Sequence, residues 1–335
     1  MERFIITGDL HTRATNPKSR LDNYQQALFA KLEWVFAKAK QLRAAGIIIP
    51  GDLFDSWNVA ITTVGDLAIL FKQAPCPIYA IPGNHDLVAG NPQTKHRTPY
   101  YLLVRMGLIR DLDMRRIDHS TTVLTGHGFT FETDTPEGLR QFVGRYVDHE
   151  ESDVALDGPA LLLPCHIHVV HSMLLHSPHP HARHTLIEDV VTSANVIITG
   201  HDHAGFGVHI REDGVLFINA GALGRLAASK GEMERQVQIA VLEIEGSDYG
   251  AYLLPVTCAR PGHEVLSRVH IEAEEQKNEQ LESFLTLLAS EGEQKFLEVT
   301  EIVEDIAARE NLPKIVVQEA LSRISAARES LGGKE

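Results

Sequence analysis

Four short apolar runs, each followed within three residues by aspartate, asparagine or histidine, most constrain how this chain folds. They cover residues 4–7, 46–49, 77–81 and 195–199. Near-continuous β-branched runs of this length are typical of strands buried on both faces of a sheet. The polar residues that follow such strands gather at one edge, where open α/β sheets hold their sites. The sequence therefore predicts an α/β protein with a polar site at a sheet edge.

The polar residues after these runs are of the types that bind metal ions, and they are Asp9, His11, Asp52, Asp55, Asn84, His85, Asp86, His201 and His203. Carboxylate oxygen, amide oxygen and imidazole nitrogen suit manganese, iron, zinc or nickel. Two such ions about 3.5–4 Å apart can hold a hydroxide and orient a phosphoryl group. An aspartate can bridge them, because its two oxygens can each face one ion. We therefore predict metal-assisted hydrolysis of a phosphoester.

One further ligand is expected between Asn84 and His201, and the candidates are His166, His168 and His171. A strand over 161–165 would deliver His166, but it would hold Pro164 inside a central strand, where proline is rarely found. A strand over 167–170 leaves the proline outside and places His171 at its end. We therefore favour His171 and keep His166 as the alternative.

The motifs Asp9-x-His11, Gly51-Asp52-x-x-Asp55, Gly83-Asn84-His85-Asp86 and Gly200-His201-x-His203 resemble the signature of the calcineurin-like metallophosphoesterases over about residues 1–260. The resemblance implies that Asp9, His11 and His203 hold one divalent ion. It implies that Asn84, His201 and a further histidine, here His171, hold a second ion. Asp52 would bridge the two ions. His85 would contact the scissile phosphate and stabilise the transition state, and Asp86 would orient His85.

The remaining pattern predicts a four-layer α-β-β-α sandwich of two packed mixed sheets. Further strands are expected over 121–124, 129–131, 215–219, 237–245 and 252–256, and a helix from residue 21 to 42 with Asp22 as its N-cap. We expect a catalytic domain over 1–262 and a small helical C-terminal module over 263–335. Apolar residues recur at helical spacing over 281–288, 296–303 and 315–324. This module would be a cap or a surface for a partner or a second copy.

The substrate is the least constrained expectation. Residues 9–28, 98–112 and 184–189 resemble the SbcD-type DNA repair exonucleases and their phage relatives. That resemblance implies manganese-dependent DNA cleavage, a homodimer and an SbcC-type coiled-coil ATPase partner. Arg13, Lys18 and Arg20, just after His11, would form a basic loop that holds the phosphate backbone. The part of the sequence that follows the resembling residues is shorter than the corresponding part of that family.

A second hypothesis is a phosphodiesterase or phosphatase for small molecules such as nucleotides. The net charge of −14 favours it, because binding nucleic acid gains from Lys and Arg. An open groove would favour a nuclease, and a closed pocket a small substrate. A third hypothesis, a scaffold without metals, is disfavoured by the intact motifs. Magnesium is an alternative to manganese. Three scattered cysteines, no signal peptide and no long apolar run predict a cytoplasmic protein without a membrane span.

Overall fold

The computed structural model describes residues 1–119, 121–144, 165–269, 271–272, 277, 303–304, 306–308, 310 and 312–332. Contacts between residues divide the chain into two compact units, Met1–Arg268 and Val269–Glu335. The short helix α5 (Gly262–Val265) therefore belongs to the first unit. The backbone amide of Leu21 donates to the carbonyl of Val265, which ties this segment to the loop before the first long helix.

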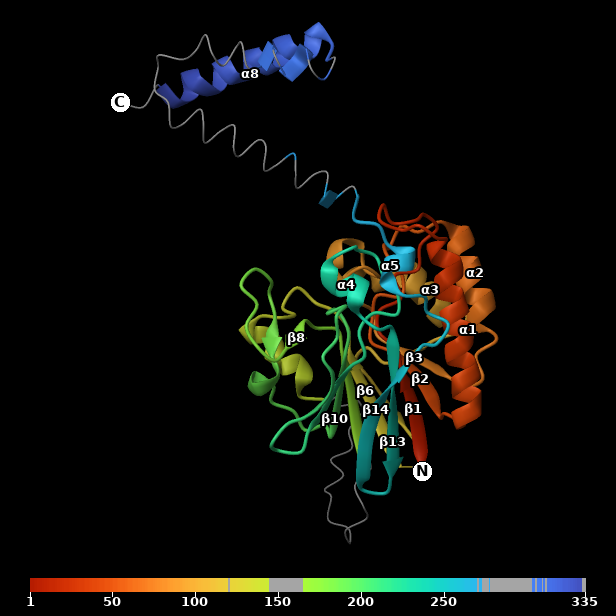
Figure 1. Cartoon of the computed structure of the whole chain (residues 1–335). Coiled ribbons are helices and arrows are strands. Elements are labelled where there is room, and N and C mark those ends of the chain that lie inside the picture. The colour runs from red at the N-terminus through yellow and green to blue at the C-terminus, as the bar shows by residue number, and fades with distance from the viewer. Residues whose placement is uncertain are drawn as a thin grey trace. The chain divides into compact units, whose positions relative to one another are not determined.

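The first sheet has the strand order β14-β13-β1-β2-β3-β4 (Figure 1). Its strands are β1 (Glu2–Ile6), β2 (Gly46–Ile49), β3 (Ile78–Ala80), β4 (Arg110–Asp111), β13 (Gln238–Glu245) and β14 (Asp248–Pro255). β1 to β4 pair in parallel, and β13 and β14 add an antiparallel edge. The sheet is therefore mixed, as expected.

The second sheet has the order β11-β12-β10-β7-β6-β5. Its strands are β5 (Arg115–Asp118), β6 (Thr122–His127), β7 (Cys165–Val170), β10 (Val196–Thr199), β11 (Gly207–Ile210) and β12 (Leu216–Asn219). The four central strands are parallel, and both edge strands are antiparallel. A separate small ribbon pairs β8 (Leu174–Leu175) with β9 (Thr185–Leu186).

Alternate residues of the central strands face different cores, because side chains on a strand point to opposite faces in turn. Phe4 and Ile6 of β1 lie in the core between the sheets. Ile5 lies between them in sequence but belongs to the core under the helices. All three side chains are fully buried, which explains why the sequence runs of these strands are apolar without alternation.

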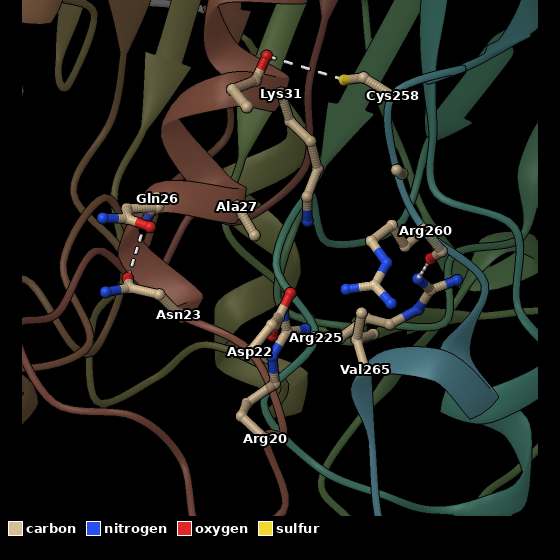
Figure 2. Close-up of a pocket in the computed structure, with 12 residues that line it drawn as sticks. Arg20, Asp22, Asn23, Gln26, Ala27, Lys31, Arg225, Cys258, Arg260 and Val265 are labelled. Carbon is tan, nitrogen blue, oxygen red and sulfur yellow. Dashed lines mark hydrogen bonds and ion pairs between the residues drawn. The ribbon is translucent and has the colours of Figure 1, made fainter.

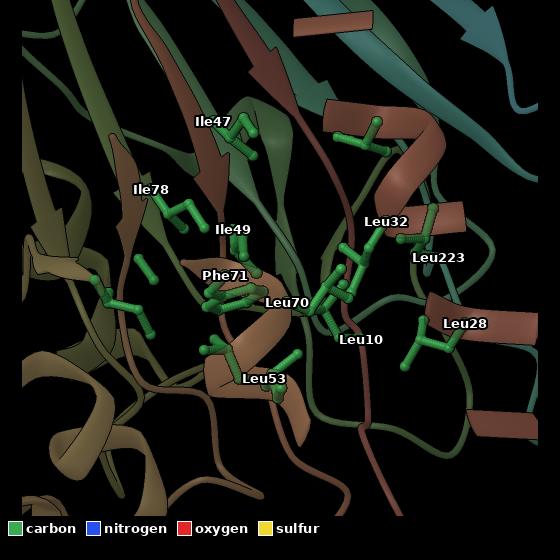
Figure 3. Packing of buried hydrophobic residues seen from close by; sticks show 14 of the residues in the cluster. Leu10, Leu28, Leu32, Ile47, Ile49, Leu53, Leu70, Phe71, Ile78 and Leu223 are labelled. Atoms are coloured by element: carbon green, nitrogen blue, oxygen red, sulfur yellow. The ribbon is translucent and has the colours of Figure 1, made fainter. Parts of the chain in front are cut away.

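Helices α1 (Tyr24–Leu42), α2 (Ile61–Phe71) and α3 (Pro99–Arg105) cover the outer face of the first sheet (Figure 1). Figure 3 shows this core, which holds Leu32 and Leu70 of the helices together with Ile49 of β2. The 3₁₀ turns η3 (Pro136–Phe142) and η4 (Ile187–Asp189) contribute Phe142 and Ile187 to the core on the outer face of the second sheet. The predicted sandwich of two mixed sheets with flanking helices is confirmed.

The remaining elements are short: η1 (Val88–Gly90), η2 (Pro92–Arg97) and α4 (Lys230–Glu234). The N-cap of α1 lies one residue later than expected, because the side chain of Asn23, not Asp22, accepts the amide of Gln26. In the second unit the structure describes α8 (Lys314–Gly332). The expected helices over 281–288 and 296–303 lie outside the described residues, except for residue 303. Within the described part of the chain, no helix is both long enough and apolar enough to cross a bilayer.

Candidate metal centre

The candidate site lies where the strand-end loops of the two sheets meet. From the first sheet, Asp9, Asp52 and Asn84 follow β1, β2 and β3. From the second, His171 directly follows β7 and His201 follows β10 by two residues. β7 begins at Cys165 and ends at Val170, so the strand that we predicted to end just before His171 is present.

Asp9, His11 and His203 form a first group whose ligand atoms could hold one metal ion. The Nε2 atoms of His11 and His203 are 2.9 Å apart, and His203 Nε2 lies 3.6 Å from Asp9 Oδ2. Two ligand atoms each about 2.1 Å from one ion lie roughly 3.0–3.4 Å apart at octahedral or tetrahedral angles. The spacing of this group therefore fits a metal ion with little movement.

Asp52, His171 and His201 form a second such group. His171 Nε2 lies 3.4 Å from Asp52 Oδ2 and 3.1 Å from the side-chain oxygen of Asn84. The other ring nitrogen of His171 donates to the carbonyl of Pro50 at 2.8 Å. That bond orients the ring and leaves Nε2 as the atom that can bind a metal.

Asp52 connects the two groups through a single oxygen. Its Oδ2 lies 3.6 Å from His11 Nε2 and 3.4 Å from His171 Nε2. Its Oδ1 accepts the backbone amide of His85 at 2.9 Å. One of the two oxygens is therefore already bonded to the backbone, and the expectation that each oxygen faces one ion stays a prediction.

Three site residues have left-handed backbone conformations. The φ angles are 47° at His11, 47° at Asp52 and 72° at His201. Residues other than glycine adopt this region at a cost, and such strain is concentrated at functional sites. The neighbouring glycines are required for close approach, because a Cβ on Gly83 would lie 2.1 Å from Asp52 Oδ1. The fold therefore gives up some stability to place these side chains.

The electrostatics of the site favour the binding of positive charge. Burial raises the pKa of Asp9 to about 8. Burial lowers the pKa of His11 to about 3 and that of His201 to about 3. Burial alone would lower the pKa of His171, but the Asp52 carboxylate raises it to about 10. Burial alone would raise the pKa of Asp52, but the charge of His171 lowers it overall.

The donor set fits divalent metal ions. Asp9 Oδ1 and Asp52 Oδ2 are buried without a hydrogen-bond partner among the described residues. A buried carboxylate oxygen without a partner is costly, and a coordinated cation would satisfy it. Metal ions displace the protons from such sites. The oxygen and nitrogen ligands suit two divalent ions, as the sequence predicted, without selecting among manganese, iron, zinc, nickel and magnesium.

His85 lies beside both groups and is exposed. Its ligand nitrogen lies within 4.8 Å of ligand atoms of His11 and Asp52. Its Nδ1 contacts the carbonyl of Asp55 at 2.8 Å. The expectation that Asp86 orients His85 is therefore corrected, because the carbonyl of Asp55 holds the ring.

Asp86 has a different task, because its carboxylate accepts three backbone amides. The amide of Phe54 donates to Oδ1 at 3.0 Å, and those of Gly83 and Leu53 donate to Oδ2 at 3.0 and 3.2 Å. Asp86 is fully buried, and burial together with the Asp52 charge raises its pKa to about 7. Asp86 therefore ties the loop of the second motif to the loop of the third.

His166 and His168 lie apart from the metal ligands, although both belong to β7. The hydroxyl of Thr125 contacts Nε2 of His166 and Nδ1 of His168, each at 2.7 Å. His168 Nε2 donates to the carbonyl of Gln141 at 2.6 Å. Both rings therefore have bonding partners on the second sheet and its cover, and the structure brings His171 to the site.

The three residues of the expected basic loop differ in how far they are exposed and in what they contact. Arg13 lies at the site, where it pairs with Asp55 at 2.9 Å. Lys18 is exposed. Arg20 is 9% exposed, pairs with Asp22 at 2.5 Å and lines a different pocket. The loop is therefore not one continuous phosphate-binding surface.

A cleft of about 450 Å³ adjoins the site, and sequence reasoning did not find it. His85 and Asn84 line it together with Trp57, Phe129 and Phe131. The expected strand over 129–131 is wrong, since β6 ends at His127 and the next residues form a loop. The amide of Phe129 donates to the carbonyl of Pro82 at 3.0 Å and fixes this loop against the third motif. Trp57, an aromatic residue in a polar strand-end loop, was the available signal.

Residues 2–205 match the family of calcineurin-like phosphoesterases, and the chain belongs to this family. No curated protein matches the chain at a significant level. Among solved structures, the chain is similar to a dimetal phosphatase from Danio rerio, with 11% identity and a TM-score of 0.46, over 76% of this chain and 96% of that one. It is also similar to a 5′-nucleotidase precursor from Thermus thermophilus, with 12% identity and a TM-score of 0.41, over 85% of this chain and 59% of that one.

Proposed function

We propose that this protein is a phosphodiesterase that requires two divalent metal ions and cleaves nucleic acid, with DNA as its substrate and manganese as its metal. Family membership supports phosphoester hydrolysis in general. The choice of nucleic acid rests on one observation, the aromatic cleft beside His85.

The proposal assigns each ligand to an ion. Asp9, His11 and His203 hold the first ion, and Asn84, His171 and His201 hold the second, with Asp52 between them. When bound, the ions supply activated water and withdraw charge from the phosphoryl group. The buried carboxylates and imidazoles hold the ions, and the histidine rings are oriented by bonds such as that of His171 to Pro50.

His85 is proposed to act on the substrate directly. Its side chain is exposed at the cleft, and the Asp55 carbonyl holds its Nδ1. The Nδ1 proton then stays in place. In the doubly protonated ring, Nε2 carries the second proton, which it can share with a phosphoryl oxygen or give to the leaving oxygen, and the ring is then left neutral with its Nδ1 proton. Charge that develops in the transition state is stabilised by such a preorganised donor. Arg13 pairs with Asp55, which lines the same cleft, so its charge balances that carboxylate beside the substrate.

The cleft walls are themselves exposed, which favours an extended substrate over one enclosed by the protein. Trp57 is 41% exposed and Phe131 is 61% exposed, so neither ring is covered. Nucleobases stack on exposed aromatic side chains, and each stacked base contributes about 1–3 kcal/mol. A strand whose phosphate lies at the metals would place a neighbouring base against these rings.

A second candidate is a phosphodiesterase of free nucleotides. The aromatic walls would accept the base of a nucleotide as well as a base in a strand. The net charge of −14 specifically favours it, because a long polyanion is repelled over its whole length. Both candidates use the same residues for hydrolysis.

The test compares manganese-dependent degradation of end-labelled linear DNA with turnover of bis-p-nitrophenyl phosphate. The wild type should cleave both, and His85→Ala should lose both while it keeps its metals. Trp57→Ala should reduce DNA cleavage about tenfold and spare the small diester. Tyr252→Ala is a matched control, because Tyr252 is also 41% exposed. Turnover of the small diester and of nucleotides alone would transfer the proposal to the second candidate.

The expected partners stay predictions. We propose the C-terminal unit as the place where a second copy or a coiled-coil ATPase of the SbcC type binds. Two apolar residues of α8 support this, since Ile315 is 75% exposed and Val316 is 46% exposed. Light scattering of the full chain after size-exclusion chromatography decides whether it forms a dimer.

A further inference from the structure

A second pocket, of about 300 Å³, lies in the first unit and shares no lining residue with the aromatic cleft. Figure 2 shows Lys31 of α1 together with Arg20, Arg225 and Arg260 around this pocket. These residues come from the loop before α1, from α1 itself, from the segment after β12 and from the segment after β14. Three separate parts of the chain therefore bring basic side chains to one place.

Two of the four cations are buried and donate hydrogen bonds to backbone carbonyl groups. Lys31 is 5% exposed and donates to the carbonyl of Leu223 at 2.5 Å. Arg225 is 4% exposed and donates to the carbonyls of Arg260 and Arg235. These partners are neutral carbonyl groups. The two charges are therefore held in position without a carboxylate in these bonds.

The positive charge of the pocket exceeds its negative charge. Asp22 is the one carboxylate among the described lining residues, and it pairs with Arg20. Arg260 pairs with Glu264 on its exposed side, where the Arg260 side chain is 55% exposed. The Nε atoms of Arg20 and Arg225 are buried without a hydrogen-bond partner among the described residues. Unpaired buried donors are rare in native proteins.

The buried ammonium group responds to this environment. Burial, together with the charges of Arg20, Arg225 and Arg235, lowers the pKa of Lys31 to about 7. The same residues that repel one another would all be stabilised by one anion. The chain has a net charge of −14, yet basic side chains are concentrated around this pocket. An anionic ligand would compensate their charge.

We propose that this pocket binds a phosphate group, as inorganic phosphate or as the terminal phosphate of a small ligand or strand. Arginine and lysine together recognise phosphate oxygens, arginine through paired donors and lysine as a point charge. A pocket of about 300 Å³ is at the small end of ligand sites, and it fits a phosphate group with little attached to it. The proposal does not depend on the proposed hydrolysis.

Arg260→Gln is the cleanest variant. The Arg260 side chain is largely exposed, so the fold should tolerate its loss. Lys31→Gln is the second variant, although Lys31 also holds the Leu223 carbonyl, and the amide of Leu223 donates to the Asp9 carbonyl beside the metal centre. Arg323→Gln is the matched control, because Arg323 also pairs with a glutamate four residues away on the surface.

The experiment is a calorimetric titration of the full chain with inorganic phosphate. It is done once in the presence of a chelator, which removes metal ions, and once in the presence of manganese. Binding without metal isolates the pocket from the metal centre. We expect saturable binding that Arg260→Gln weakens at least tenfold with an unchanged melting midpoint. Lys31→Gln should also weaken binding at least tenfold, while Arg323→Gln has no effect. No binding at millimolar phosphate, or equal affinity in both pocket variants and the wild type, would overturn the proposal.

Two further arms identify the source of the phosphate. Stronger binding of a 5′-phosphorylated oligonucleotide than of the same strand without that phosphate supports the site and assigns it to strand ends. Binding of inorganic phosphate alone supports it as a small-anion site. Arg260→Gln should also hydrolyse bis-p-nitrophenyl phosphate at the wild-type rate. If the protein hydrolyses no phosphoester, the phosphate titration still tests the pocket, because it requires no hydrolysis.

Discussion

The metal centre and the basic pocket are two buried clusters of charged side chains, and the sign of the charge that would compensate each cluster is opposite. In the first, Asp9 and Asp52 leave carboxylate oxygens without partners and call for cations. In the second, Lys31 and Arg225 are buried beside further arginines and call for an anion. In both, the fold accepts the cost of burying charge, which isolated side chains would avoid by changing protonation. Each cluster therefore carries charge that a ligand of the opposite sign would compensate.

The two clusters differ in how they are built. Each metal ligand lies within a few residues of a strand end, and the backbone there is strained, as the φ of 47° at Asp52 shows. The residues of the pocket come from a loop, a helix and two distant segments without a shared motif. The first cluster can be read from local sequence, and the second cannot.

The largest expected effect is that of Asp52→Asn, which should break one cluster and spare the other. Asparagine tolerates the left-handed conformation at this position, so the fold should persist. Loss of the shared carboxylate should remove metal and lower turnover by about a thousandfold, roughly 4 kcal/mol. Elemental analysis and diester turnover measure the loss, and phosphate binding at the pocket is the control. Retention of two ions would show that Asp52 does not connect the groups.

Asp86→Ala should lower the stability of the fold strongly and the rate of hydrolysis only slightly. Three buried amides lose their acceptor, and each unsatisfied group costs about 1–3 kcal/mol. The free energy of unfolding should fall by several kcal/mol in urea titrations. Turnover per metal-loaded folded molecule should stay within a few fold, because the Asp55 carbonyl holds His85. A selective loss of turnover with normal stability would restore Asp86 as the group that orients His85.

Without metal, the stability of the chain should fall as pH rises from about 6 to 9. The folded-state pKa of His171, about 10, lies above the unfolded value of 6.5, so its contribution is full below pH 6.5 and is lost toward pH 10. The pKa of Asp9, raised from 3.8 to about 8, acts in the same direction between those values. Manganese should flatten the profile, because it displaces these protons. A metal-free profile that rises across this range would contradict the assignment.

The smallest expected effect has the opposite sign and belongs to the pocket. The pKa of Lys31 is lowered from 10.5 to about 7, so between these values the unfolded chain holds a proton that the folded chain has lost. The Lys31 contribution to stability therefore rises with pH across this range. Lys31→Gln should remove this rise. The measurement is the free energy of unfolding of wild type and variant in urea, at pH 7 and at pH 9. The wild-type value minus the variant value should be larger at pH 9 than at pH 7, and saturating phosphate should make this pH dependence smaller.

Sequence reasoning reached the strands, the sandwich and the residue types of the site, because each depends on a few neighbouring residues. The position of Pro164 correctly placed the end of β7 before His171. It could not show that Asp52 uses one oxygen for a backbone amide, or that Asp55 holds His85. Those bonds join segments that are about thirty residues apart or more, and their geometry depends on loop conformation.

By itself, the sequence determined the order of the strand-end motifs and the kinds of ligand that they carry. Apolar runs that alternate between two cores must form central strands, and their ends must meet at a sheet edge. The tertiary structure alone decided that Trp57 and Phe131 border the cleft and that Arg20 belongs to another pocket. Such placements depend on contacts between distant segments, which no local pattern specifies.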